Sequence, residues 1–268
     1  MIEVHPSAVI DKSVELADGV SIGPNCVVGA NSSIGRGTVL WPNVVVGRNV
    51  NIGRRNHLYP NCVIGYSPQI LGMKPDAEFG ALQIGDDNTI RENVTIHPSM
   101  HAGHTTRVGN ENLLMIGVHI GHDCNIEDKT VMSNFVQVSG HCKICTGVWL
   151  SGMVLLHQFI TVGRWVYAAG LAGLNHDVPP FVIVSGHYPV KVRGINKRGL
   201  KRAGLSEAQQ DAIMSAYKKL YRQDGVPLLE SARKLAAEDG LDENVRDMVD
   251  VIIKSSEHRY GRYLETFR

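Results

Sequence analysis

Two histidines and an aspartate interrupt an aliphatic stretch near the middle of the 268-residue chain. His119, His122 and Asp123 lie within LLMIGVHIGHDC, residues 113–124. An imidazole titrates near neutral pH, so it can remove a proton from a hydroxyl group during catalysis. The same side chains could instead be polar members of a buried strand. The choice between these interpretations depends on the segments that bring further groups beside them.

An apolar residue recurs at every sixth position of the chain. Val, Ile or Leu occupies each of these positions from Val4 to Ile64, and the phase resumes at Ile84 and again from Val108 to Leu174. A period of six fits neither a helix nor an alternating strand. It indicates a hexapeptide solenoid, in which each short strand and turn forms one side of a triangular coil.

The sequence predicts a mainly β chain in two parts. Residues 1–180 form the solenoid, and the period breaks at two loops, near 65–83 and 98–107. Loops that leave a rigid scaffold often carry functional residues. Residues 181–268 form an α-helical C-terminal domain.

A capping box supports the helical prediction for the second part. Ser206 precedes Gln209 by three positions, which is typical of a helix start. The apolar residues that follow fall on one face of a helix: Ile213, Ala216, Tyr217 and Leu220.

The solenoid predicts which distant residues are neighbours. One coil takes three hexads, so each residue lies one strand spacing, about 4.8 Å, from the residue eighteen positions later. This stacking puts Gly140 over His122 and Gln158 over Gly140, with His141 and His157 adjacent. A backbone N–H such as that of Gly140 can hold an oxygen that becomes negative during acyl transfer. The convergence favours a reaction centre over a buried strand.

Composition narrows the functional class. The chain has 27 Lys and Arg against 26 Asp and Glu, so it lacks the overall charge of a nucleic-acid or membrane-surface protein. Its apolar runs are too short to span a bilayer. Five cysteines and no apolar leader before Val4 suggest a reducing cytoplasm. Four cysteines share the small fifth slot of a hexad, where we expect them to pack in the core rather than bind metal: Cys26, Cys62, Cys124 and Cys142.

Several motifs in order make the chain resemble one family of enzymes. These are NLLMIGVHIGHDC, SGH, LHQF, DVPPFV and NKRGLKRAG. The chain is similar over nearly its whole length to the bacterial acyl-[acyl-carrier-protein]–UDP-N-acetylglucosamine O-acyltransferases, which start lipid A synthesis. The resemblance implies a left-handed parallel β-helix, a homotrimer with sites between subunits, and no metal or cofactor. It also implies two substrates, an acyl carrier protein bearing a 3-hydroxyacyl group and a UDP-amino sugar.

The resemblance also implies roles for individual residues. His122 matches the general base, Asp123 the residue that orients it, and Gly140 the backbone N–H that serves the oxyanion. Gly170 matches the position that measures acyl length, with Tyr167 nearby. The remaining matches fall in the substrate pocket (Lys74, His97, His119, His141, His157, Gln158) and near the nucleotide (Asn196, Arg202).

Three departures from the family pattern keep other functions open. The sugar loop SPQILGMK lacks an aspartate usual in the family, Arg198 replaces a glutamate, and Ala203 replaces a second arginine. Some relatives acylate a 3-amino sugar to form an amide, and this chain could do so. Two further alternatives are a zinc-dependent hydratase of the γ-carbonic anhydrase type and a binding scaffold without turnover.

Overall fold

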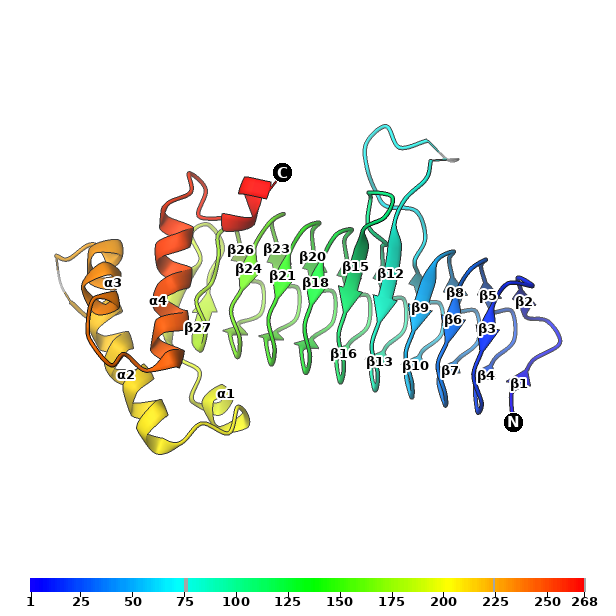
Figure 1. The fold of residues 1–268 in the computed structure, drawn as a ribbon, viewed down its shortest axis with the longest axis horizontal. Helices are drawn as coiled ribbons and strands as arrows, with labels where there is room; N and C mark the ends of the chain where they lie inside the picture. Colours follow the sequence, from blue (N-terminus) through cyan, green and yellow to red (C-terminus); the bar gives the residue numbers. More distant parts are fainter. Residues whose placement is uncertain (75–76, 224, 268) are drawn as a thin grey trace.

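The chain folds as a triangular β-helix followed by a group of short helices (Figure 1). The computed structural model describes residues 1–74, 77–223 and 225–267. The prediction of a mainly β hexapeptide solenoid is confirmed, since from β1 to β26 strands of two to four residues alternate with turns and pair in parallel in three sheets.

Each sheet forms one face of the prism, and from β1 to β26 consecutive strands belong to consecutive faces. The first face contains β1 (Glu3–Val4), β4 (Ser21–Ile22), β7 (Val39–Leu40), β10 (His57–Leu58), β13 (Thr89–Ile90), β16 (Leu113–Leu114), β19 (Val131–Met132), β22 (Trp149–Leu150), β25 (Tyr167–Ala168), β27 (Val182–Ser185) and β28 (Lys191–Ile195). The second contains β2 (Val9–Ile10), β5 (Val27–Val28), β8 (Val45–Val46), β11 (Val63–Ile64), β14 (Thr95–Ile96), β17 (His119–Ile120), β20 (Gln137–Val138), β23 (Leu155–Leu156) and β26 (Gly173–Leu174). The third contains β3 (Glu15–Leu16), β6 (Ser33–Ile34), β9 (Val50–Ile52), β12 (Ala81–Ile84), β15 (Thr105–Val108), β18 (Asn125–Ile126), β21 (Lys143–Ile144) and β24 (Thr161–Val162).

The apolar position of each hexad forms the core of the prism. Leu58, Ile64, Ile96 and Ile120 are each 0% exposed. The cysteines of the fifth slot are also confirmed as core residues: Cys26, Cys62, Cys124 and Cys142 are buried with free thiols. The core therefore runs as a continuous apolar column inside the three sheets.

Turn residues at the corners adopt left-handed backbone conformations. Asn25, Asn43 and Asn61 have φ between 58° and 66°, a region that asparagine tolerates better than most residues. The same corner conformation recurs at Asp123 (φ 59°) and His141 (φ 61°). Two residues of the expected reaction centre therefore occupy strained positions, a feature that clusters at functional sites.

Two loops leave the prism at the corner between the second and third faces (Figure 1). One lies between β11 and β12, the other between β14 and β15. The loops add residues between stacked strands. Val63 therefore pairs with Thr95, and Thr95 with His119, and not with the residues eighteen positions later. The coils nevertheless keep their registry on both sides of the loops.

The solenoid is followed by a β-hairpin and then by helices. β27 pairs with β25 in parallel and with β28 in antiparallel orientation, so residues 182–195 extend the first face before any helix begins. The helices are α1 (Lys197–Arg202), α2 (Glu207–Tyr221), α3 (Leu228–Ala236), α4 (Glu243–Ser256) and the 3₁₀ helix η1 (Tyr263–Phe267). The division at residue 180 stays a prediction.

The predicted capping box and buried face of α2 are both confirmed. The Gln209 N–H donates to Ser206 Oγ and the Ser206 N–H donates to Gln209 Oε1. The buried residues of α2 are Ile213, Ala216, Tyr217 and Leu220. In the part of the chain that the structure describes, no helix combines the length and the hydropathy needed to cross a bilayer.

A substitution in the column should destabilise the fold strongly. We expect Leu58→Ala to lower the free energy of unfolding by about 2–5 kcal/mol, because it leaves a cavity at a fully buried position. Val9→Ala, at a position 65% exposed, is the control and should change stability by less than about 0.5 kcal/mol. Equal effects of both substitutions in urea unfolding would contradict this description of the core.

Candidate active site

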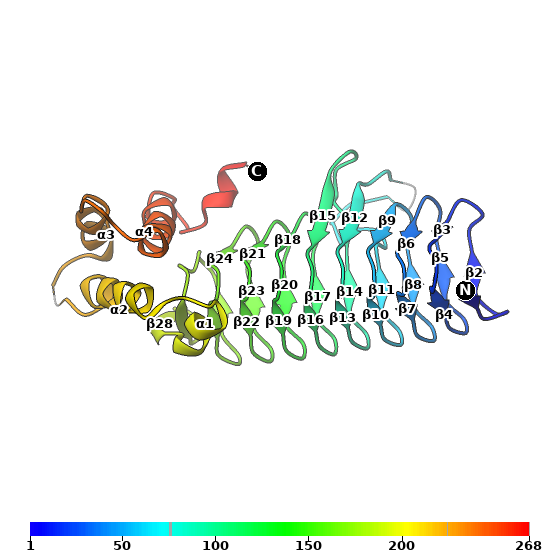
Figure 2. The same cartoon turned by 60° about the horizontal axis from the view of Figure 1, so that its bottom comes forward.

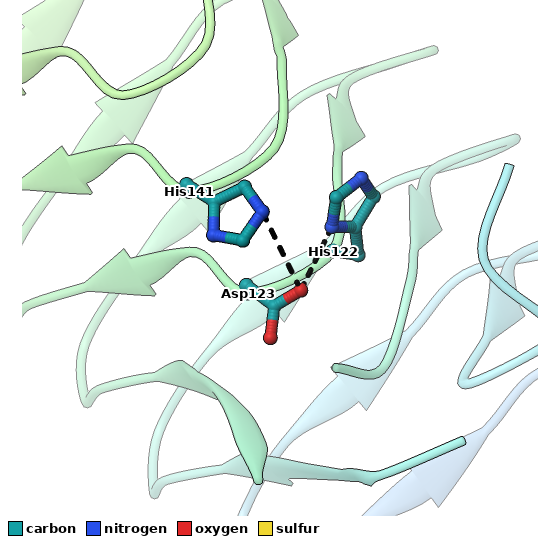
Figure 3. A group of neighbouring side chains, drawn as sticks. All are labelled: His122, Asp123 and His141. Carbon is teal, nitrogen blue, oxygen red and sulfur yellow. Dashed lines mark hydrogen bonds and ion pairs between the residues drawn. The ribbon is translucent and has the colours of Figure 1, made fainter. Parts of the chain in front are cut away.

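An imidazole and a carboxylate meet at the corner that joins β17 to β18. His122 Nδ1 lies 2.8 Å from Asp123 Oδ2, and their side chains are 13% and 10% exposed (Figure 3). This contact assigns the proton to Nδ1 and leaves Nε2 of His122 as the acceptor. The arrangement matches a general base with an orienting carboxylate.

Asp123 is held by three further groups. The Ser99 hydroxyl donates to Oδ1 and the Met100 N–H donates to Oδ2 at 3.1 Å. Its own N–H donates to Thr106 Oγ1 at 2.7 Å. Burial alone would raise the pKa of Asp123, but the hydrogen bonds from His122, Ser99 and Met100 outweigh it and lower the pKa to about 2. Asp123 is therefore an ionised acceptor at neutral pH.

The next coil brings Gly140 and His141 against this pair, as the eighteen-residue stacking predicts. The His141 N–H donates to the His122 carbonyl at 2.9 Å. A Cβ on Gly140 would lie 2.7 Å from His122 Cε1, so only glycine lets the ring pack here. A Cβ on Gly121 would lie 2.7 Å from the Gly140 nitrogen. Within the described residues the Gly140 N–H has no hydrogen-bond acceptor.

His141 faces both the carboxylate and an aromatic ring. Its Nε2 lies 3.9 Å from Asp123 Oδ2 (Figure 3), and its ring is 5.0 Å from that of His122. On the other side it stacks on Phe159 at 4.5 Å, with the ring planes 8° apart. Successive coils thus build a ladder of His122, His141 and Phe159.

His97 and His119 extend the cluster towards the N-terminal coils. Their rings lie 5.3 Å apart. Burial lowers the pKa of His97, and burial together with the neighbouring His97 and His122 lowers the pKa of His119 to about 4. Both imidazoles are therefore neutral at pH 7. His97 Nε2 is buried and has no partner among the described residues, so it can hydrogen-bond a ligand.

The remaining pocket residues are exposed. His157 and Gln158 lie one coil beyond Gly140, where Phe159 donates its N–H to the Gly140 carbonyl. Lys74, in the loop 65–83, is exposed.

Four of the predicted residues lie away from the histidine corner. Tyr167 is on β25 of the first face, and Gly170 follows at the corner that leads to the second face. The Arg202 guanidinium stacks 4.8 Å from the ring of Trp149, also on the first face. Asn196 caps α1 through Oδ1 and donates from Nδ2 to the Trp165 carbonyl. One copy of the chain therefore does not bring all predicted site residues together.

Sequence reasoning missed several contacts of the histidine cluster. Thr95 Oγ1 lies 2.9 Å from His119 Nδ1, and Ser99 contacts Asp123 from the coil before. These pairs are 24 residues apart because the loop 98–107 lengthens that coil, so the stacking rule of eighteen does not find them. Phe159 was detectable, since it stands eighteen positions after His141.

Three ligand-type atoms converge at the same corner. One ligand atom each from His122, Asp123 and His141 lie within 4.8 Å of one another, a spacing that could hold a metal ion. The Asp123 carboxylate is already an acceptor for His122, Ser99 and Met100. Local geometry alone thus allows either a proton-transfer site or a metal site.

Two family models match the chain. One, described as UDP-N-acetylglucosamine O-acyltransferase, domain 2, matches residues 177–261. The other, described as bacterial transferase hexapeptide (six repeats), matches residues 1–36 and 31–66.

Curated relatives extend the match over most of the chain. The acyl-[acyl-carrier-protein]–UDP-N-acetylglucosamine O-acyltransferase of Janthinobacterium sp. (strain Marseille) is 42% identical over 238 residues, which are 88% of this chain and 89% of that protein. The enzyme of the same name from Halorhodospira halophila (strain DSM 244 / SL1) is 38% identical over 95% of this chain and 98% of its own. The chain belongs to this acyltransferase family.

Coverage differs among the relatives. The match to the Synechocystis sp. (strain ATCC 27184 / PCC 6803 / Kazusa) protein of the same name, at 39% identity, spans only 51% of that relative. Among solved structures, the UDP-N-acetylglucosamine acyltransferase of Francisella novicida is 36% identical and superposes with a TM-score of 0.89 over 97% of this chain and 93% of that one. The family resemblance drawn from the motifs is confirmed.

The low pKa of Asp123 predicts how stability depends on pH. Its ionised form contributes stability above the ordinary value of 3.8, and that contribution is lost as pH falls towards about 2. We expect Asp123→Asn to cost about 2 kcal/mol in unfolding free energy at pH 7, and the difference from the unmodified chain to shrink below about pH 4. Urea unfolding across this range measures both.

The exposed Asp239 provides the matched control. Asp239→Asn should change the unfolding free energy by less than about 0.5 kcal/mol at either end of the range. A cost of Asp123→Asn that stays constant down to about pH 3 would contradict the pKa given for this carboxyl group.

Proposed function

We propose that this chain transfers a 3-hydroxyacyl group from acyl carrier protein to the glucosamine 3-hydroxyl of a UDP-N-acetylglucosamine-type nucleotide sugar. The resemblance puts this reaction at the start of lipid A synthesis. One observation carries the proposal: the His122 ring lies between the Asp123 carboxylate and Gly140, whose N–H has no acceptor within the described residues.

The geometry supports direct transfer without an acyl-enzyme. His122 Nε2 removes the proton from the sugar hydroxyl as its oxygen attacks the carbonyl carbon of the thioester. The carbonyl oxygen becomes negative and accepts a hydrogen bond from the Gly140 N–H. The C–S bond then breaks, and the imidazolium returns its proton to the leaving thiolate. Asp123 stabilises the imidazolium through Nδ1–H and keeps the ring oriented.

The neutral histidines suit the acceptor sugar. His97 and His119, with lowered pKa values, can hydrogen-bond sugar hydroxyl groups without carrying a charge. His157, Gln158 and Lys74 are exposed and are available to polar parts of the substrate.

We further propose that the active unit is a homotrimer with its sites between subunits. His122 stands at the corner of the second and third faces, whereas Gly170 stands at the corner of the first and second. Arg202 and Asn196 also lie by the first face. A neighbouring copy can bring its first-face residues to the histidine corner, which one copy cannot do.

The ruler residue lies beside an exposed apolar column. Phe135, Met153 and Leu171 are 50%, 51% and 68% exposed and follow one another at eighteen-residue steps. Gly170 and Gly152 add no side chain to this edge. The space beside Gly170 is open, because a Cβ placed there would come no closer than 3.4 Å to its nearest neighbour, the Gly152 carbonyl oxygen. The edge therefore offers a surface for a long hydrocarbon chain, and Tyr167 lies on β25 in the same coil as Gly170.

The relatives do not favour the alternative reactions. The curated relatives are named O-acyltransferases, so the hydroxyl acceptor has more support than a 3-amino sugar or a zinc-dependent hydratase. The complete His122, Asp123 and Gly140 arrangement argues against a scaffold without turnover. Five free cysteines, four of them buried, fit a reducing compartment such as the cytoplasm.

Removal of the base should abolish most turnover. We expect His122→Ala to lower kcat by about 10² to 10⁴, with a normal melting temperature. The assay is mass spectrometry of the product formed from a 3-hydroxyacyl carrier protein and UDP-N-acetylglucosamine. His5→Ala, which changes an exposed histidine at the far end of the prism, is the control and should retain full activity. Near-normal activity of His122→Ala would end the base assignment.

Mixed trimers test whether neighbours share a site. We expect His122→Ala and Arg202→Ala chains, refolded or co-expressed together, to recover up to about one quarter of normal activity, because random assembly pairs an intact His122 with an intact neighbouring Arg202 at that frequency. Trimers of each variant alone give the baseline activity. Activity no higher than the sum of the two separate variants would argue that each copy holds a complete site.

A further inference from the structure

The C-terminal segment returns to the β-helix and packs against its last coils. Figures 1 and 2 both show the red C-terminal segment alongside the last coils, next to the third face. η1 begins at Tyr263, and its second residue, Leu264, is half-buried. Nothing in the motifs or in the proposed mechanism gives this segment a role.

Buried contacts hold the segment in place. The Thr161 N–H donates to Asp177 Oδ1 and the Tyr263 N–H donates to Asp177 Oδ2, at 2.7 and 2.9 Å. The Asp177 N–H donates to the Gly261 carbonyl at 2.7 Å. Asp177 is only 4% exposed. One carboxylate thus joins the last strand of the third face to the start of η1.

Arg262 adds a second anchor just before η1. It is 8% exposed, and its guanidinium donates to the Asn175 carbonyl at 3.3 Å and to Glu265 at 2.9 Å. Gly261 has φ +64°, and a Cβ there would lie 2.9 Å from His176 Cβ, so the chain turns tightly against the coil. The position of Leu264 is therefore set by the packed backbone before it.

Leu264 lines a hollow that reaches the reaction centre. A cavity of about 250 Å³ is bounded by Asp123, His141, Phe159 and Leu264, with Asn125 and Lys143 among its polar lining. Leu264 also borders a larger cavity of about 630 Å³ between the third face and α4. The C-terminal segment thus forms a wall between the active-site hollow and the groove beside the helices.

We propose that Leu264 is a specificity-determining residue that packs against a substrate bound at His141. The hollow has two apolar walls, Phe159 and Leu264, and hydrogen-bonding groups at Asn125 and His141. This lining fits a short amide-bearing aliphatic group. The inference rests on the proposed function, whose two substrates both carry such a group: the N-acetyl group of the sugar and the amide-containing thioester arm of the donor.

The test compares two changes of size at one position. Leu264→Trp should fill the hollow, and Leu264→Ala should remove a wall. We expect the first to raise the KM of one substrate about tenfold and the second about threefold or more, with kcat changed less than about threefold, since the lost contact is made in both ground and transition states. The substrate whose KM rises is the one whose amide-bearing group occupies the hollow.

Leu228 on α3, 37% exposed, is the matched control for both substitutions. Leu228→Trp and Leu228→Ala should leave both KM values unchanged. The inference is overturned if the Leu264 variants melt normally and keep both KM values within about twofold, or if they lower kcat alone. Failure of the proposed function itself would appear separately, as an unmodified chain that forms no product.

Discussion

The registry between stacked coils is the constraint on which the other features depend. Parallel strands pair with a displacement of eighteen residues through the second half of the solenoid, as between His119 and Gln137. Hydrogen bonds along each ladder and the continuous apolar column inside resist a slip of even one residue, because a slip would turn the core positions outward. The same registry sets Gly140 against His122, so the stability of the fold and the geometry of the site have one origin.

The corners give this regular scaffold its candidate site. Turn residues point away from the core, and at one corner they are Asp123, His141 and Phe159 instead of asparagines. The loop after β14 then adds Ser99 and Met100, which saturate the Asp123 carboxylate with hydrogen bonds and depress its pKa. The loop thus helps to set the pKa of Asp123, while the stacked coils set the positions of the side chains.

The triangular cross-section explains why the candidate site is divided. A corner exposes side chains from two faces only, so Gly170 and Arg202, which lie by the first face, are separated from His122 within one copy. Association of copies brings different edges together without changing the fold. The C-terminal segment has the complementary effect, because it brings residues distant in sequence to the third face of the same copy.

The sequence by itself determined the solenoid, its core, and the stacking of Gly140, His141 and Gln158 over the coil of His122. A strict period of six makes every coil eighteen residues long, so it fixes which residues stack. It also determined the family, because the family motifs are short, contiguous segments that can be recognised without a structure. Only the tertiary structure decided the partners of Asp123, the occupied amide of Asn196, and the approach of Leu264. These depend on loops and on a chain end that follow no period, so their positions come from packing and hydrogen bonding between segments remote in sequence.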